Sequence, residues 1–253
     1  MREKFEKLTD SQWEVMAGFL PVQRKRKNDL REVVDSIRWI NETGSQWRNL
    51  PACFPCWDAV YYYFRQWKLD GTLYILNIGL NILERSAWEK EDSPSLVCVD
   101  SQSIKVAPFI NNDKGIDGNK KVNGRKRQVL VDTLGLVWAV FVHAANGNDS
   151  VYGCRLVEQI EGLCDRLKKI LVDKGYDGQF IPFATQKLGV EVEISSRPPT
   201  ERGFVPIKWR WVSERTFGWF NFFRRLSKDY EKTVESSEAW IMWANCQMII
   251  SKW

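Results

Sequence analysis

The chain has 253 residues, of which 44% are hydrophobic and 27% charged, a composition typical of folded proteins. Its 37 basic and 32 acidic residues give a net charge of +5, too small to indicate a polyanionic partner unless the basic residues cluster. The longest apolar run, 134–142, is about half of the ~18 residues that suggest a membrane span, and the first residues contain no secretory signal. Export and membrane insertion are excluded, and we expect a cytoplasmic protein with reduced cysteines.

Histidine and cysteine usage limits the chemistry further. His143 is the single histidine, so zinc sites that need two or three histidines cannot be built. Cys53 and Cys56 have CxxC spacing, but no second pair follows at zinc-ribbon spacing, and we interpret them as packing thiols. A metal ion in this chain is therefore expected on oxygen ligands.

The first ninety residues predict a small all-α region. Ser11-Gln12-Trp13-Glu14 has the form of a capping box, and a second apolar pattern with helical spacing starts near Asp29 and ends at Gly44, which suits a left-handed cap. The expected helices span 11–20, 28–44, 57–67 and 72–88. A charged stretch at 89–94, ending in proline, is the expected boundary between an N-terminal domain, 1–90, and a second domain, 91–253.

The second part changes to short apolar runs of strand type. Expected strands lie at 96–99, 129–131, 136–142, 170–172 and 190–194, with helices at 150–168 and 180–188 and a long helix from near Val212. Strands alternating with helices after a hairpin predict a mixed sheet with helices packed on it, an α/β fold.

Two aspartates share one context, directly after a buried strand. Asp100 ends Val97-Cys98-Val99-Asp100, and Asp173 ends Ile170-Leu171-Val172-Asp173. If the two strands are neighbours, both carboxylates emerge at one edge of the sheet, where a cation between them would offset their repulsion. Mg²⁺ suits such a site because it prefers oxygen ligands. The alternative is that each aspartate only begins a turn.

A third acid, Glu214, lies on the exposed face expected of the long helix. A wheel at 100° per residue places it on one stripe with Gly218, Asn221, Arg225 and Lys228. Three other aspartates have simpler interpretations: Asp132 as a hairpin turn, Asp149 as a helix cap, and Asp177 as a neighbour of the site or a loop residue.

In these motifs the chain resembles the DDE transposases of bacterial insertion sequences, specifically insertion-sequence family five. The resemblance covers nearly the whole length. It rests on these blocks: Gly44-Ser45-Gln46-Trp47-Arg48-Asn49-Leu50-Pro51, Val99-Asp100-Ser101-Gln102-Ser103-Ile104-Lys105, Gly124-Arg125-Lys126-Arg127 running into Val131-Asp132-Thr133-Leu134-Gly135, Asp173-Lys174-Gly175-Tyr176-Asp177-Gly178, and Arg210-Trp211-Val212-Ser213-Glu214-Arg215-Thr216-Phe217-Gly218-Trp219. The YREK signature of these transposases keeps its Arg and Glu as Arg210 and Glu214, but Ile207 and Asn221 replace its Tyr and its basic residue.

The resemblance implies an RNase H-like catalytic domain, a mixed sheet flanked by helices, whose catalytic and metal-binding acids are Asp100, Asp173 and Glu214. It also implies two Mg²⁺ ions, with Mn²⁺ able to substitute, which serve strand cleavage and strand transfer to target DNA. The implied partners are double-stranded DNA, at the element's terminal inverted repeats and at the target, and further copies of the chain in a homodimer or larger synaptic assembly. A nucleoid-associated location follows from the same likeness.

Clustered basic residues are the candidates for DNA contact, through phosphates and without sequence information. The alternative for the basic clusters is that they are solvated loops. For the helix that carries Arg65 after Tyr61-Tyr62-Tyr63-Phe64, the alternative is core packing. The candidates are Arg24, Lys25, Arg26, Lys27, Arg65, Lys120, Lys121, Arg125, Lys126, Arg127, Arg210, Arg224, Arg225 and Lys228. Two other functions stay open at this point: a DNA-binding protein of the same fold that no longer cuts, and an RNase H-like nuclease that cuts without strand transfer.

Overall fold

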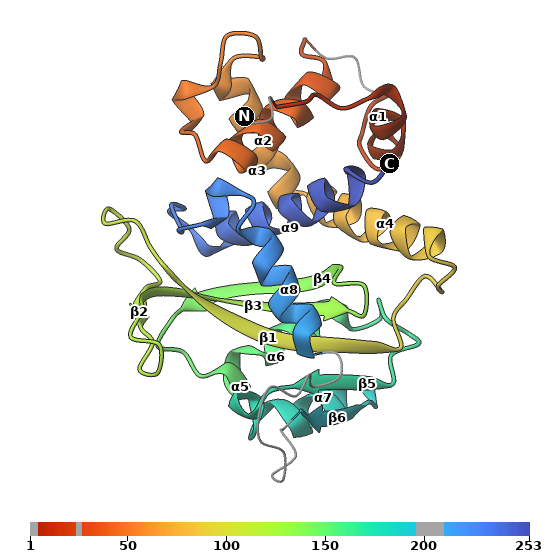
Figure 1. The fold of residues 1–253 in the computed structure, drawn as a ribbon, viewed down its shortest axis with the longest axis vertical. Coiled ribbons are helices and arrows are strands. Elements are labelled where there is room, and N and C mark those ends of the chain that lie inside the picture. Colours follow the sequence, from red (N-terminus) through yellow and green to blue (C-terminus); the bar gives the residue numbers. More distant parts are fainter. Residues whose placement is uncertain (1–4, 24–26, 196–209) are drawn as a thin grey trace.

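The computed structural model describes residues 5–23, 27–195 and 210–253, and it shows one sheet with helices around it (Figure 1). Its N-terminal part is helical, as the sequence predicts. The helices of this part are α1 (Asp10–Ala17), α2 (Leu30–Thr43), the 3₁₀ turn η1 (Trp47–Asn49), α3 (Trp57–Leu69) and α4 (Thr72–Ala87). No helix within the described residues is long and apolar enough to cross a membrane.

The remaining elements form the sheet and its covering helices. In chain order they are β1 (Leu96–Lys105), β2 (Gly115–Ile116), β3 (Asn123–Asp132), β4 (Val137–Ala144), α5 (Asp149–Tyr152), α6 (Cys154–Ile160), β5 (Lys169–Val172), η2 (Lys174–Tyr176), α7 (Phe180–Leu188), β6 (Glu191–Ile194), α8 (Arg210–Phe220), η3 (Arg224–Leu226) and α9 (Val234–Ile250). In Figure 1, α8 crosses β1, α5 to α7 lie on the β5 and β6 side, and the N-terminal helices lie beyond α9.

The sheet runs in the order β4-β3-β1-β5-β6, with the short β2 paired to the start of β3. β3 pairs antiparallel with both β1 and β4, whereas β1, β5 and β6 pair in parallel. A mixed sheet of this order, flanked by helices, confirms the predicted RNase H-like α/β class. β1 and β5 are adjacent parallel strands, and β5 ends at Val172, level with Val99 in the middle of the longer β1.

The helix starts follow local capping chemistry. The capping box of α1 is formed by Thr9 and Gln12 and not by the predicted Ser11 and Glu14. In α2 the prediction is confirmed: the Asp29 side chain caps the start, and Gly44, at φ 70°, ends the helix in the left-handed region. These caps fix α2 so that its apolar stripe faces the core.

The C-terminal helix α9 was not predicted, because it has no polar face to give a helical period. It packs against α4 and against the edge strand β4, and residues from Ala239 to Ile250 are buried nearly all round. One hydrophobic core therefore runs continuously from the N-terminal helices into the sheet. Helix α4 precedes the boundary predicted at 89–94, but it packs against α9 and β4, which follow that boundary in the chain.

Side chains satisfy the free backbone of the edge strand β4, which would otherwise offer unpaired donors for aggregation. The amide of Val137 donates to Asn245 Oδ1, that of Val140 to Gln159 Oε1, and that of Val142 to Glu238 Oε1. The helices that cover β4 thus supply the acceptors that a further strand would have provided.

Two predicted helices are shorter in the structure. The helix predicted over 150–168 is broken into α5 and α6 and ends at Ile160, and α8 ends at Phe220, where Asn221 and Phe222 turn back through hydrogen bonds to Gly218 and Trp219. The stripe predicted to run from Glu214 to Lys228 does not exist, because only its first part is helical. The strands β1 and β3 are longer than predicted, since their polar ends pair with each other.

Candidate active site

Asp100 and Asp173 leave the sheet at the same level. β1 and β5 pair in parallel with Leu96 opposite Lys169, Val97 opposite Ile170 and Cys98 opposite Leu171. Continuing this register two residues further sets Asp100 opposite Asp173, on strands about 4.8 Å apart. The sequence-based expectation that the two strands are neighbours is therefore correct.

Helix α8 brings Glu214 to the same strand. The Ser213 hydroxyl donates a 3.0 Å hydrogen bond to Asp100 Oδ2, and Glu214 follows directly, with an exposed side chain. The Arg215 guanidinium lies between the rings of Trp211 and Trp219, 4.4 and 4.5 Å from their centroids. Glu214 is thus held beside β1 by its neighbours on the helix.

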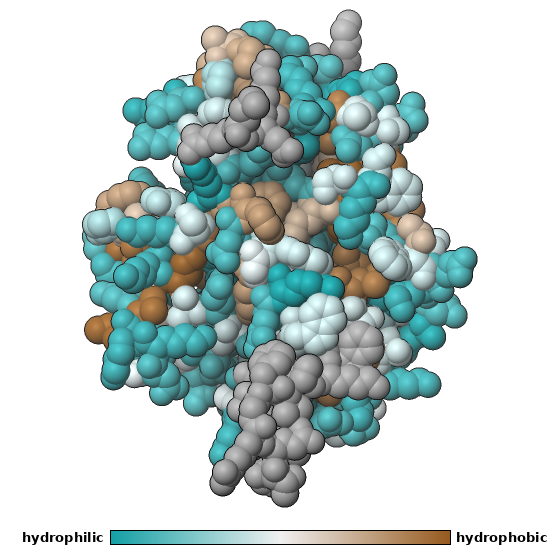
Figure 2. All heavy atoms as spheres, viewed as in Figure 1, coloured by the Kyte–Doolittle hydropathy of each residue, from teal (hydrophilic) through white to brown (hydrophobic). Residues whose placement is uncertain are grey.

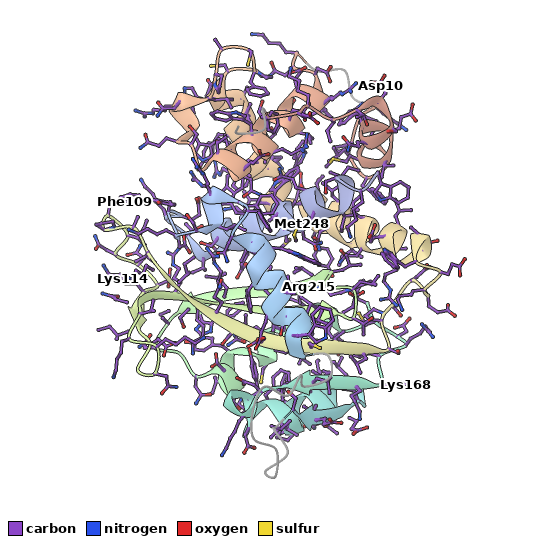
Figure 3. The ribbon with its side chains drawn as sticks, in the orientation of Figure 1. Asp10, Phe109, Lys114, Lys168, Arg215 and Met248 are labelled. Atoms are coloured by element: carbon purple, nitrogen blue, oxygen red, sulfur yellow. The ribbon has the colours of Figure 1, made fainter. Side chains whose placement is uncertain are left out.

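The turn between β3 and β4 fixes the position of α8. Arg215 Nη2 donates to the Leu134 carbonyl at 3.0 Å, and Thr216 Oγ1 donates to the Gly135 carbonyl at 3.1 Å. Asp132 shapes this turn by accepting from the amides of Leu134 and Leu136, which confirms its predicted role in the hairpin. Figure 3 shows Arg215 midway along α8, where the helix lies over the sheet.

A fourth carboxylate, Asp149, belongs to this region. An atom at the Cβ position of Gly175 would lie 3.0 Å from Asp173 Oδ1 and 3.4 Å from Asp149 Oδ2, so the two acids flank the same glycine. The predicted capping role of Asp149 is wrong, because Asn148 caps α5 by accepting from the Ser150 amide at 2.8 Å. Because Asp149 lies at a helix start, the sequence did not indicate that its side chain faces the segment of Asp173 and Gly175.

The hydroxyl of the buried Tyr176 lies close enough to these acids for their charges to act on it. Burial raises the pKa of the Tyr176 hydroxyl well above its usual value, and the negative charges of Asp149, Asp100 and Asp173 raise it further. Three carboxylates therefore surround one buried phenol, at the carboxyl end of β5. We call Asp100, Asp149, Asp173 and Glu214 the carboxylate rim.

The rim has the donor chemistry of a Mg²⁺ or Mn²⁺ site, but it is not a closed cage. Within the described residues, no group of three or more His, Cys, Asp and Glu side chains is arranged to hold a metal ion by itself. Mg²⁺ is commonly held by one or two carboxylates, with waters and substrate phosphates completing its coordination. Hard oxygen donors fit such a shared site.

Two lysines predicted to contact DNA lie exposed beside the rim. Lys120 and Lys121 occupy the turn between β2 and β3, and Lys120 Nζ approaches the Ser101 carbonyl at 3.4 Å, one residue from Asp100. Asp117 shapes this turn by accepting from the amides of Asn119 and Lys120. Burial acts to raise the Asp117 pKa, but these hydrogen bonds and one from Ser103 lower it to about 2, so the turn stays charged and ordered.

Four predicted DNA contacts are wrong, because the side chains are buried, and three of the four pair with carboxylates inside the protein. Arg125 is fully buried and donates to Asp229 Oδ2 and the Glu231 carbonyl, while Arg127 is 2% exposed. Lys126 is buried and pairs with Asp149 at 3.1 Å. Arg225 is buried too, with Glu231 as its partner at 2.6 Å. These cations belong to the core and cannot reach a phosphate.

The other predicted contacts remain predictions. Lys27, Arg65 and Arg224 are exposed, and Lys228 is half-buried. Arg24, Lys25, Arg26 and the side chain of Arg210 lie outside the described residues. Arg65 shares its helix face with the exposed Tyr61 and Tyr62.

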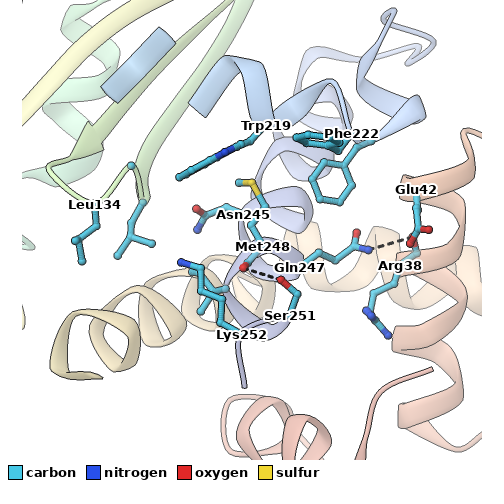
Figure 4. Close-up of a pocket in the computed structure, with 14 residues that line it drawn as sticks. Arg38, Glu42, Leu134, Trp219, Phe222, Asn245, Gln247, Met248, Ser251 and Lys252 are labelled. Atoms are coloured by element: carbon cyan, nitrogen blue, oxygen red, sulfur yellow. Dashed lines mark hydrogen bonds between the residues drawn. The ribbon is translucent and has the colours of Figure 1, made fainter. Parts of the chain in front are cut away.

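One cavity lies apart from the carboxylate rim. It has a volume of about 590 Å³ between α2, the β3–β4 turn, the end of α8 and α9, with Trp219, Phe222 and Met248 in its lining (Figure 4). Its lining is mainly apolar and contains no member of the carboxylate rim. Across the face shown in Figure 2, hydrophobic side chains form separate patches on a largely hydrophilic surface.

Comparisons with known proteins agree with the family to which the sequence motifs point. Residues 91–249 match the family described as "Transposase DDE domain", and residues 8–77 match "Putative transposase of IS4/5 family". A curated relative, the putative transposase for insertion sequence element IS402 of Burkholderia cepacia, is 32% identical over 130 residues, or 49% of this chain and 61% of the relative. An uncharacterized protein, y4sN of Sinorhizobium fredii, is 32% identical over 93 residues, or 34% of this chain and 72% of that protein.

Among solved structures, the Mos1 mariner paired end complex with Mn matches with a TM-score of 0.34 and 10% identity, over 96% of this chain and 84% of that chain. This likeness is too low to carry an argument. The mixed sheet flanked by helices, with Asp100 within β1 and Asp173 directly after the adjacent parallel strand β5, fits an RNase H-like α/β protein. The chain belongs to the transposase family with a DDE domain, of the IS4/5 type. The matched segment spans 61% of the length of the IS402 relative.

Proposed function

We propose that this protein is an insertion-sequence transposase that cuts DNA at the ends of its element and joins the cut strand to a target. The observation that carries the proposal is the register of β1 and β5, which sets Asp100 level with Asp173, together with the hydrogen bond from Ser213, next to Glu214, to Asp100. Both observations support a shared site for three acids that are far apart in the sequence. Family membership supports the assignment of these acids as catalytic.

Metal ions supply the charge that this reaction needs. Two divalent ions, Mg²⁺ or Mn²⁺, would neutralise phosphate charge and lower the pKa of an attacking water. Asp100, Asp173 and Glu214 would hold them, with DNA phosphate oxygens as further ligands. The acids are placed for this task by rigid elements, two strands and a packed helix, which is what an accurately aligned displacement at phosphorus requires.

The chain itself positions the DNA. Lys120 and Lys121 lie exposed beside Asp100, where they would hold the backbone of the strand that is cut. The exposed face of α3, with Arg65, and the segment that includes Lys27 would bind the terminal inverted repeat, as part of an N-terminal DNA-end-binding domain spanning 1–90. Two ends must be joined in one event, so the working form would be a dimer or larger synaptic assembly on the nucleoid.

A plasmid assay tests the proposal. A supercoiled plasmid that carries the element's ends, incubated with the protein and Mg²⁺, should be nicked at those ends and should yield products joined to target DNA. Replacing Asp100 by alanine should reduce cutting to the level without protein, while a gel shift shows unchanged DNA binding. Cutting that survives in Asp100→Ala would overturn the site assignment.

The same assay separates the alternative functions. A wild-type protein that binds the ends but never nicks them would be a binding protein of this fold that has lost catalysis. Nicking that leaves 3′-hydroxyl ends with no joined product would indicate a nuclease without strand transfer. The intact Asp100, Asp173 and Glu214 favour the transposase over both.

A further inference from the structure

The short strand β2, in the connection between β1 and β3, exposes a large apolar side chain. Ile116 is 61% exposed, although β2 is paired with the start of β3, with Gly115 opposite Gly124 and Ile116 opposite Asn123. A single exposed apolar residue is common on protein surfaces and indicates nothing by itself. The case for Ile116 therefore depends on how the residue is held, which way it points and what surrounds it.

Hydrogen bonds on both sides of Ile116 hold its backbone in place. Before it, the buried Arg125 donates from Nε to the Asp113 carbonyl and from Nη2 to the Asn112 carbonyl, each at 3.2 Å. After it, the Asp117 carboxylate accepts from two backbone amides of the next turn, at 2.9 and 3.0 Å. Contact between Ile116 and a ligand would thus require little ordering of the chain.

The neighbours of Ile116 occupy the opposite face of β2. A Cβ atom at Gly115 would collide with the side chain of Asn146, and the Asp117 carboxylate accepts from the Ser103 hydroxyl. Successive side chains of a strand point to opposite faces of the sheet. The face of Gly115 and Asp117 is therefore closed by protein, and Ile116 projects from the other face, where it stays exposed.

Ile116 shares its face of the sheet with Asp100. Ile116 is opposite Asn123 in β3, and Asp100 is opposite Val129, six residues further along the same strand. Opposite residues share a face, and an even number of steps along a strand returns to the same face. Six residues span about 20 Å of strand, which equals the length of about six base pairs of DNA.

The exposed charges around Ile116 are mainly positive. Arg125 Nη2 also lies 3.5 Å from the Lys232 carbonyl, so the exposed Lys232 adjoins the same connection. Figure 3 shows Lys114 of this connection at the outer edge of the molecule. Between residues 105 and 122, all of which the structure describes, the exposed charged residues are Lys105, Lys114, Lys120, Lys121 and one acid, Asp113. Two copies of such a surface would repel each other, whereas DNA phosphates would be attracted.

We propose that Ile116 is an apolar wedge that inserts between base pairs of the bound DNA, about six base pairs from the phosphate that is cut. Isoleucine is among the side chains that enter a base step, partly unstack it and kink the duplex. Lys120 and Lys121 hold the backbone on the same connection. The inference rests on the proposed function, and it deepens it by naming a residue that deforms the DNA.

Fluorescence of 2-aminopurine tests the wedge, because this base analogue emits weakly when it is stacked and strongly when it is unstacked. The full chain is mixed with short duplexes that carry the element's end, with Ca²⁺ in place of Mg²⁺ to prevent cutting. Each duplex has one 2-aminopurine, at about three to nine base pairs from the cleavage site. The wild type should raise the emission about 3-fold at one or two adjacent positions. Ile116→Ala should lose most of this rise, and Ile116→Leu, which keeps an apolar side chain of equal size, should retain it.

The matched control is Ile75→Ala, on α4. It makes the same change at a side chain of similar exposure, 58%, on a helix that packs against α9 and β4 and not against β2. Emission with Ile75→Ala should rise as with the wild type. Ile116→Ala should also leave the slope of log affinity against log salt unchanged, because isoleucine neutralises no phosphate. Thermal unfolding of each variant should match the wild type, since both positions are exposed.

The outcomes separate this inference from the proposed function. If the wild type cuts at the element's ends but its binding raises the emission at no position, the wedge is wrong and the transposase assignment stands. The same holds if Ile116→Ala raises the emission as the wild type does. A wild type that does not bind the duplex would overturn both. If Ile116→Ala instead reduces self-association of the DNA-free chain in sedimentation, Ile116 belongs to a contact between copies and the wedge is wrong.

Discussion

Charged side chains gather in two regions of this protein, and the two regions differ in how the charges are balanced. The carboxylate rim is mainly acidic: Asp149 and Asp173 flank Gly175, both act with Asp100 on the buried Tyr176, and Lys126 pairs with Asp149. The second region, which we call the β3 charge network, contains Arg125, Asp229, Glu231 and Ser237, where opposite charges meet and every bond is internal.

The comparison teaches which charges serve stability and which serve function. Asp229 accepts from Arg125 Nη1 at 3.3 Å and from the Ser237 hydroxyl at 2.7 Å, and its side chain is almost fully buried. A buried pair of this kind costs desolvation on both sides and holds the fold only while both partners are present. In the rim, Asp149 pairs with Lys126, but the neighbouring carboxylates repel one another, and a bound cation would offset that repulsion.

The largest expected effect comes from breaking the β3 charge network. Asp229→Ala leaves the guanidinium of Arg125 buried without its carboxylate, and we expect the free energy of unfolding to fall by about 3–5 kcal/mol. Denaturation with urea measures this directly. Asp177→Asn, an exposed acid near the rim, should change it by no more than about 0.5 kcal/mol. An equal effect of the two substitutions would remove the distinction between the regions.

A second test uses Glu238, a lone buried acid that accepts from the edge strand β4. Burial raises the Glu238 pKa from 4.5 to about 7, so the folded chain binds this proton more tightly than the unfolded chain does. The stabilisation from protonated Glu238 is complete below about pH 4.5 and is lost as the pH rises to about 7. Glu238→Gln keeps the acceptor for the Val142 amide without the charge.

Glu238→Gln should therefore stabilise the protein by about 1–3 kcal/mol at pH 8 and hardly at all at pH 4.5. Urea denaturation across this pH range measures the difference. A stabilisation that does not change with pH would mean that Glu238 is already charged, with a normal pKa, in the folded protein.

The sequence predicted the α/β class and the neighbouring strands that carry Asp100 and Asp173, because buried apolar strands are visible in a run of residues. It placed the end of β1 wrongly, since this strand continues past Asp100 to Lys105. It could not show that Arg125, Lys126 and Arg127 are buried, since a run of basic residues looks the same on a surface and against a buried carboxylate such as Asp229. The partner of Arg125, Asp229, lies 104 residues away in the chain, and only the fold brings the two together.

Asp149 and α9 were missed for related reasons. A capping role is enough to explain an aspartate that follows Asn-Gly-Asn, so the sequence indicated no other role for Asp149. Only its position beside Gly175 in the structure shows that it faces Asp173. The helix α9 lacks a polar face because it is enclosed between α4 and β4, so its sequence carries no amphipathic period. Local pattern thus predicts elements that have one exposed face, and it fails where tertiary packing covers every side.

A third test distinguishes exposed cations from buried ones in DNA binding. Replacing Lys120 and Lys121 together by glutamine should reduce the salt dependence of DNA affinity by about two phosphate contacts, as the slope of log affinity against log salt measures. Lys168→Gln is the control: this lysine is exposed, but it lies at the opposite end of β5 from Asp173 (Figure 3). An unchanged slope in the double variant would place the DNA elsewhere on the molecule.

The smallest expected effect on stability comes from the rim itself. Asp173→Asn keeps an oxygen that accepts from the Gly175 amide, a bond of 2.8 Å, and it relieves repulsion from Asp149. The free energy of unfolding should change by no more than about 0.5 kcal/mol, or rise slightly, while strand cleavage is lost. A loss of stability like that of Asp229→Ala would show that Asp173 is held by a structural partner. A residue that can be neutralised without cost to the fold, and only with loss of the reaction, is retained for its ligand.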